Sequence, residues 1–235
     1  MIEVTLPDLS GAQGESWEAL MRVAPLLGNS WILVGGQLVL LHQVERGFGN
    51  IRPTADIDLV VDIRVDLNGL ASTHQTLTEC GFDQDPPNCM GVAHRYSKRG
   101  ATIDVLAPER LGPRADLTLG AGNTIEAPGT RQAFSRRESV AVEFRGLTVE
   151  IHRPNLVGAL FGKAAAFTKI ASQSQASKAK HLGDFESLAH LLNPDDRSLA
   201  KLTKSERKTI SKVVSSRDIG STALRSIELL LEASA

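Results

Sequence analysis

Strand-type spacing of hydrophobic residues dominates the first part of the chain, and helical spacing dominates the last part. Before about residue 152, apolar residues form short runs or alternate with polar ones, as in Trp31–Val34 and Asp56–Val61, which predicts β-strands. From Asn155 onward they recur at helical spacing, beginning with Leu156, Ala159 and Leu160. Strands followed by helices predict an α+β fold: a mixed β-sheet core with flanking helices, α/β-like in its head, and then a helical C-terminal part.

The same change of period predicts two domains. We expect a core over residues 1–152 and a helical domain over residues 153–235, joined near Arg153-Pro154. Residues 1–152 carry 13 Lys and Arg against 19 Asp and Glu, and residues 153–235 carry 13 against 8, so the net charges are −6 and +5. An acidic part suits catalytic carboxylates and a basic part suits a polyanion. Solvated helix faces that differ in charge explain the asymmetry equally well.

Individual elements follow from periodicity and from turn residues. We expect helices over residues 15–27, 37–46, 66–80, 155–170, 178–192, 198–214 and 220–233. We expect strands over 31–34, 56–61, 92–97, 101–106, 139–144 and 147–151, with the last four forming two hairpins. The Gly-, Pro- and Arg-rich residues 107–135 predict irregular structure, and the polar residues 171–177 predict a loop.

Composition is ordinary for a globular protein, with 42% hydrophobic and 23% charged residues. No apolar run approaches the roughly 18 residues of a membrane span. The first residues, MIEVTLPDLSGAQGE, lack the basic and apolar regions of a signal peptide. Cys80 and Cys89 are the only cysteines and do not have metal-knuckle spacing. A cytoplasmic protein with reduced thiols and no membrane association is the expectation.

Three carboxylates in predicted strands are the first candidate chemistry. Asp56 and Asp58 stand one residue apart, so strand alternation places both side chains on one face while Ile57 points to the other. Asp104 lies in an otherwise apolar strand, where an unpaired charge is costly to bury. A divalent cation such as Mg²⁺ would offset this cost and would orient a nucleoside triphosphate. Incidental surface acids are the alternative interpretation.

A glycine pair precedes these acids. Gly35-Gly36 lies between the predicted strand Trp31–Val34 and the following helix. Glycine lets backbone N–H groups approach phosphate oxygens closely, and the helix N-terminus favours an anion. Any tight strand-to-helix turn also favours glycine, so the pair gains its meaning from the acids that follow it.

Together these motifs resemble the nucleotidyltransferase signature of the polymerase-β-like superfamily. They are Val34-Gly35-Gly36, then Thr54-x-Asp56-Ile57-Asp58, then Ile103-Asp104. The longer separation of the glycines from the acids, and the string from Arg52 to Asp58, are similar to the AbiEii/MenT-type nucleotidyltransferase toxins. The resemblance covers about residues 30–192. It implies that Asp56, Asp58 and Asp104 hold metal, and that Gly35, Gly36 and Thr54 contact the nucleotide.

A second pair of motifs resembles the same family more loosely. Lys163-Ala-Ala-Ala on one predicted helix and Lys180-His-Leu-Gly-Asp184 on the next fit its lysine and aspartate helices. The resemblance implies that Lys163 neutralises the triphosphate as a point charge and that Asp184 orients Lys163 or Lys180. The Ser/Gln-rich residues 171–177 and Gly183 depart from the family pattern.

The resemblance implies a Mg²⁺-dependent nucleotidyltransferase that transfers a nucleoside monophosphate from an NTP to the tRNA 3′ end. It further implies the toxin of a toxin–antitoxin system, with a cognate antitoxin protein as partner. Two alternatives stay open: transfer to an aminoglycoside-like small molecule or to a protein hydroxyl, and a catalytically idle relative that acts as a binding module.

Several other residues have two interpretations. Thr54 braces the turn before the acids or lies at the metal site, and Asp62 shares the face of Asp56 and Asp58 but is expected in water at the strand end. His181 is the one histidine near a motif. Four arginines could be phosphate ligands or solvated loop residues: Arg52, Arg131, Arg136 and Arg137. Five basic residues on one predicted helix could bind an RNA backbone or form a solvated helix face: Lys201, Lys204, Arg207, Lys208 and Lys212.

Overall fold

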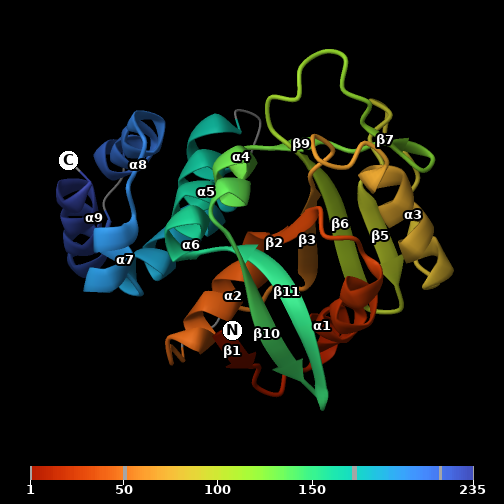
Figure 1. Ribbon diagram of the computed structural model, residues 1–235, viewed down its shortest axis with the longest axis horizontal. Helices are drawn as coiled ribbons and strands as arrows, with labels where there is room; N and C mark the ends of the chain where they lie inside the picture. Colours follow the sequence, from red (N-terminus) through yellow and green to blue (C-terminus); the bar gives the residue numbers. More distant parts are fainter. Residues whose placement is uncertain (1, 50–51, 171–173, 217–218, 235) are drawn as a thin grey trace.

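A six-stranded mixed sheet organises the first part of the chain (Figure 1). The protein is described here by a computed structural model that covers residues 2–49, 52–170, 174–216 and 219–234. The strand order is β2 (Trp31–Val34), β3 (Asp56–Val61), β6 (Ala101–Pro108), β5 (Arg95–Lys98) and β4 (Asp83–Gln84), with β9 (Glu126–Ala127) paired to β6. β3 and β6 are parallel, whereas β2 and β5 run antiparallel to their neighbours. The α+β class with a helical C-terminal region is thereby confirmed.

A second, three-stranded sheet lies beside the first. Its order is β1 (Ile2–Thr5), β10 (Arg137–Phe144) and β11 (Leu147–Pro154), and β11 packs against β2. The hairpin of β10 and β11 was predicted, although both strands extend beyond the predicted ends. β1 was not predicted, because its four residues become a strand only by parallel pairing with β10, far away in sequence.

The helices confirm most of the periodicity analysis. They are α1 (Gly11–Val23), α2 (Gly35–Glu45), α3 (Gly69–Glu79), α4 (Thr130–Ser135), α5 (Leu156–Lys169), α6 (Gln175–His190), α7 (Pro194–Leu199), α8 (Lys204–Ser216) and α9 (Ser221–Ala233), with a 3₁₀ turn at Ala24–Leu26. None of the helices within the described ranges is both long and apolar enough to cross a membrane.

Three element predictions were wrong in detail. Residues 107–135 are not irregular throughout, because they contain β7 (Thr118–Leu119), β8 (Gly122–Asn123), β9 and α4. The helix expected over 198–214 is two helices, since an Asn193–Asp196 capping box starts α7 at Pro194 and α8 begins at Lys204. Of the loop expected over 171–177, residues 171–173 lie outside the described residues, and α6 already begins at Gln175, capped by Ser174.

Alternation along β3 gives the large sheet two different faces. Ile57, Leu59 and Val61 enter the main hydrophobic core, on the face covered by α1. Val60, on the opposite face, packs with Ile32 and Ala133 in a small separate cluster. Asp56 and Asp58 precede Val60 on this second face, so the acids stand where the apolar cover ends.

One hydrophobic core spans the predicted domain boundary. β11 runs through residue 152 to Pro154, and the main core cluster includes residues from both sides, among them Leu33 and Val105 from the sheet and Leu160 and Leu188 from α5 and α6. The division into residues 1–152 and 153–235 stays a prediction.

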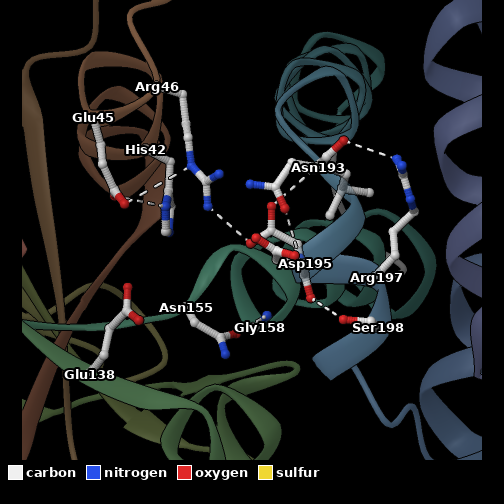
Figure 2. Close-up of polar contacts among 12 residues, drawn as sticks. His42, Glu45, Arg46, Glu138, Asn155, Gly158, Asn193, Asp195, Arg197 and Ser198 are labelled. Carbon is white, nitrogen blue, oxygen red and sulfur yellow. Dashed lines mark hydrogen bonds and ion pairs between the residues drawn. The ribbon is translucent and has the colours of Figure 1, made fainter.

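A buried ionic network ties the sheets to the helical part, close to the region in Figure 2. The Arg153 side chain is 0% exposed and pairs with Glu45 and Glu138. His42 Nε2 contacts the Pro154 carbonyl oxygen at 3.1 Å, and burial together with the charge of Arg153 lowers the pKa of His42 to about 4, so its imidazole is neutral at pH 7. From the end of the same helix, the C-cap residue Arg46 donates through Nη2 to Asp196 of α7 at 2.9 Å.

Replacing the arginine at the centre of this network tests how much the network contributes to the free energy of unfolding. We expect Arg153→Ala to lower the free energy of unfolding by about 3–5 kcal/mol, because it removes a fully buried guanidinium and leaves two partly buried carboxylates without their cation. Urea denaturation measures the change. Arg145→Ala is the matched control: Arg145 pairs with Glu18 but is 40% exposed, so its loss should have a much smaller effect. Equal losses for the two variants would contradict the assignment.

Candidate active site

The predicted acids meet in one row across the large sheet. Val34, Asp58, Asp104 and Arg95 are successive register partners on β2, β3, β6 and β5. Side chains at matched positions of neighbouring strands point to the same face. Asp58 and Asp104 are therefore direct neighbours on parallel strands, and Asp56 lies on the same face two residues earlier.

Gly35 is required by the position of Asp58. Gly35 has a φ of +74°, in the left-handed region that glycine adopts without strain, and it is the first residue of α2. A Cβ atom at Gly35 would stand 1.7 Å from Asp58 Oδ2. The carboxylate of Asp58 therefore lies directly against the backbone where the helix begins, and no side chain fits between them.

The side chain of Thr54 packs against the backbone of Gly36, as that of Asp58 does against Gly35. A Cβ atom at Gly36 would lie 2.8 Å from the Thr54 side chain. Gln37 Nε2 donates to the Thr54 carbonyl oxygen at 2.5 Å, and the buried Trp17 Nε1 donates to Gln37 Oε1 at 2.7 Å. This relay fixes the residues before β3 relative to α1 and α2. Thr54 braces the turn, as one of its two interpretations predicted, and sequence reasoning missed Gln37.

The electrostatics of the row are unfavourable for charge on Asp58. Burial and the negative charge of Asp104 raise the pKa of Asp58 to about 7, with a smaller contribution from Asp56, against the opposing charge of Lys163. Asp58 is therefore partly protonated at neutral pH. A cation between these oxygens would remove the repulsion.

Arg95 is the cation that the structure itself places there. Its Nε and Nη2 donate to the two carboxylate oxygens of Asp104, each at 2.8 Å, and Nη2 lies 3.6 Å from Asp56 Oδ2. The hydrogen bonds to Asp104 raise the pKa of Arg95 above its ordinary value. Sequence reasoning missed Arg95, because only the antiparallel register of β5 on β6 brings it beside Asp104.

The two helical motifs also meet. Lys163 Nζ, on α5, donates to Asp184 Oδ2 of α6 at 2.7 Å, so Asp184 contacts Lys163, one of the two lysines considered from the sequence. Arg52 donates to both oxygens of Asp184, at 3.1 and 3.2 Å. The cations outweigh the effect of burial and lower the pKa of Asp184. Arg52 thus braces Asp184 from the loop that precedes β3.

These elements enclose a cavity of about 350 Å³. Asp58, Asp104 and Lys163 lie on its polar side, together with Gly35. Much of the remaining lining is apolar and comes from the segment 125–130, α4 and α5, including Ile125, Pro128, Ala133, Ala159 and Ala166. A compound with both charged and apolar parts matches such a lining.

His181 of α6 also lines the cavity. Burial, with Lys163 nearby, lowers the pKa of His181 to about 4, so the ring is neutral at pH 7. Its buried Nδ1 has no hydrogen-bond partner among the described residues. His181 therefore adds an uncharged polar group to the cavity wall.

The donor set fits a divalent cation once Arg95 is released. Mg²⁺ prefers carboxylate oxygens and accepts as few as one or two from a protein. The raised pKa of Asp58 shows that negative charge at this row lacks compensation. In the described part of the chain, no group of three His, Cys, Asp or Glu side chains converges in a form that could hold a metal ion. The guanidinium of Arg95 occupies both oxygens of Asp104.

Other candidate residues lie outside this cluster. Asp62 was expected in water, but it is 5% exposed and pairs with Arg64 at 2.7 and 2.8 Å. Arg136 is held by Glu206, and Arg137 donates to the Asn29 carbonyl oxygen. Arg207 of α8 donates to the Ser234 carbonyl oxygen. The exposed basic residues of the α8 region are Lys201, Lys204, Lys208 and Lys212.

Comparison with known proteins adds no relative: no protein-family model matches the sequence, and no curated protein matches it significantly. The likeness to the AbiEii/MenT-type toxins rests on the motifs alone.

The raised pKa of Asp58 makes a pH-dependent prediction. The carboxyl binds its proton up to about pH 7 in the folded protein but only up to about its ordinary 3.8 in the unfolded chain, so rising pH destabilises the fold between these values. Asp58→Asn removes this effect. In EDTA at pH 8 it should raise the free energy of unfolding by about 1–2 kcal/mol, and near pH 4 the gain should vanish.

Urea denaturation at several pH values measures this difference. Asp56→Asn is the control, because the Asp56 side chain is 47% exposed and its loss should have little effect. A less stable Asp58→Asn protein at pH 8, or a difference that does not vary with pH, would contradict the electrostatics described above.

Proposed function

We propose that the protein is a Mg²⁺-dependent nucleotidyltransferase that transfers a nucleoside monophosphate from an NTP to an acceptor hydroxyl. One observation carries the proposal: Asp58 and Asp104 stand in register on adjacent parallel strands, with Asp58 against the bare backbone of Gly35. The motif resemblance led to these residues from sequence alone. Their convergence in one cavity with Lys163 supports the same chemistry.

The lining of the cavity combines charged and apolar residues, which suits the phosphates and the base of a nucleoside triphosphate. Lys163 supplies positive charge to the phosphates, and Asp184 with Arg52 holds Lys163 in place. Gly35 and Gly36 let backbone N–H groups at the start of α2 approach phosphate oxygens. The apolar wall from Ile125 to Ala133 suits a nucleobase, whose faces are apolar.

The reaction is an in-line displacement at the α-phosphorus. When bound by Asp56, Asp58 and one oxygen of Asp104, Mg²⁺ would neutralise charge on the phosphates. The acceptor hydroxyl oxygen forms a bond to the α-phosphorus while the bond from that phosphorus to the bridging oxygen of the β-phosphate breaks, and pyrophosphate leaves. Asp104 orients the hydroxyl and accepts its proton. Asp104 does so only after Arg95 has released its oxygens.

The tRNA 3′ end is the proposed acceptor, and the proposed role is that of a toxin with a cognate antitoxin protein. Both follow from the AbiEii/MenT resemblance. A stripe of exposed lysines supports a polyanionic acceptor: Lys204, Lys208 and Lys212 repeat at intervals of four on α8. α8 packs against α5, the helix that carries Lys163 (Figure 1).

Labelling tests the activity and the acceptor together. Each α-labelled NTP is incubated with the protein, Mg²⁺ and either total RNA, total protein or small metabolites. We expect label in the tRNA fraction and at least a 10³-fold loss for Asp58→Ala, because an in-line phosphoryl displacement without its metal ligand loses most of its charge stabilisation (about 4 kcal/mol or more).

Asp83→Asn is the matched control, since Asp83 is an exposed carboxylate of the same sheet, on β4. It should label the acceptor like the wild type. Label in protein or small molecules would replace tRNA as the acceptor. Label that persists in Asp58→Ala, or no label with any NTP and any fraction, would overturn the proposed function.

A further inference from the structure

The Arg95 guanidinium stands where the acids need a cation. It takes both oxygens of Asp104 at 2.8 Å and reaches toward Asp56 at 3.6 Å. Asp104 is 8% exposed in its side chain, whereas Arg95 is 42% exposed, so the acid is fixed inside and the arginine reaches it from the rim. An arginine at the rim can leave its partner without unfolding the strand that carries Asp104.

Two cations cannot share these oxygens at low cost. A bidentate guanidinium uses one lone pair on each oxygen of Asp104 and places its charge within a few ångströms of the position between Asp58 and Asp104. A divalent ion bound there would be repelled by the guanidinium across a poorly screened distance. Arg95 and a metal ion are therefore competitors for one site.

We propose that Arg95 is a displaceable counterion of the acid row, which holds Asp104 while no divalent cation is bound and must leave it when a cation binds. The proposal rests on the proposed function, since it assumes that the acids hold a cation. Arg95 stabilises the metal-free protein and weakens its metal affinity. It therefore sets the threshold concentration at which the site becomes competent. Only in the loaded state does Asp104 keep one oxygen available for a hydroxyl proton, because Arg95 then no longer holds both.

Mn²⁺ binding and thermal unfolding of the full chain test this proposal with Arg95→Gln. The loss of free Mn²⁺ signal in electron paramagnetic resonance gives the affinity. We expect Arg95→Gln to bind Mn²⁺ about tenfold more tightly than the wild type, as the removal of a competing charge-assisted pair predicts. In EDTA, Arg95→Gln should unfold at a lower temperature than the wild type, and saturating Mn²⁺ should abolish most of that difference.

Arg64→Gln is the matched control. Arg64 pairs with Asp62 at 2.7 and 2.8 Å, Asp62 is 7% exposed in its side chain, and neither residue lines the cavity. Its loss should also lower the unfolding temperature, but Mn²⁺ should not restore it, because no cation replaces Arg64. A merely structural role for Arg95 would make the two variants behave alike.

The outcomes separate the two proposals. If the wild type binds Mn²⁺, Asp58→Asn does not, and Arg95→Gln binds no more tightly than the wild type, the counterion role is overturned while the metal site stands. If neither the wild type nor Arg95→Gln binds Mn²⁺, the acids hold no cation, and both the counterion role and the proposed function fall.

Discussion

The cost of placing negative charges side by side is the constraint on which this site depends. Asp58 and Asp104 are register partners on adjacent parallel strands, and Asp56 shares their face. Nothing in the packing of the sheet requires acids there, because the same face continues as Val60 and Leu106 under α4. A sheet built for stability alone would extend that apolar cover. The raised pKa of Asp58 reflects the cost of a negative charge on this buried carboxyl beside Asp104 and Asp56.

Three features of the surrounding structure stabilise the negative charge on these acids. Arg95 neutralises Asp104 from the next strand. Lys163 opposes the charge of Asp58 from α5, and its own position is fixed by Asp184 and Arg52. Gly35 allows the start of α2 to approach Asp58, where the helix dipole favours an anion. These stabilising groups come from different elements. The site therefore forms only when the sheet, α2, α5 and α6 are assembled together.

Local pattern predicted the elements of the site well, and tertiary register decided the rest. β3 was predicted with its observed ends, because Asp56 to Leu59 alternates, Val60 and Val61 are strand-favouring, and the segment follows Pro53. Asp104 was placed correctly because a lone carboxylate in an apolar strand stands out. Arg95 could not be found this way: an arginine at the start of a short strand looks like any surface residue until the pairing of β5 with β6 is known.

The same reasoning explains the misses outside the site. β1 has only four residues, and its partner β10 lies far away in sequence, so no local signal marks it. Asp62 was expected in water because strand ends are commonly exposed, yet Arg64 two residues later folds back and buries it. The cluster of Arg153, Glu45 and Glu138 was invisible for a similar reason, since its members lie on three different elements.

We propose that Asp56, Asp58 and Asp104 hold a divalent cation in place of the charge that Arg95 supplies to the row. Anomalous scattering from crystals grown with Mn²⁺ and a non-hydrolysable NTP analogue tests it most directly. We expect a Mn²⁺ peak within about 2.5 Å of carboxylate oxygens of Asp56 and Asp58, the triphosphate beside Lys163, and Arg95 withdrawn from Asp104. A bound analogue with no Mn²⁺ at these acids, and with Arg95 still paired to Asp104, would contradict it.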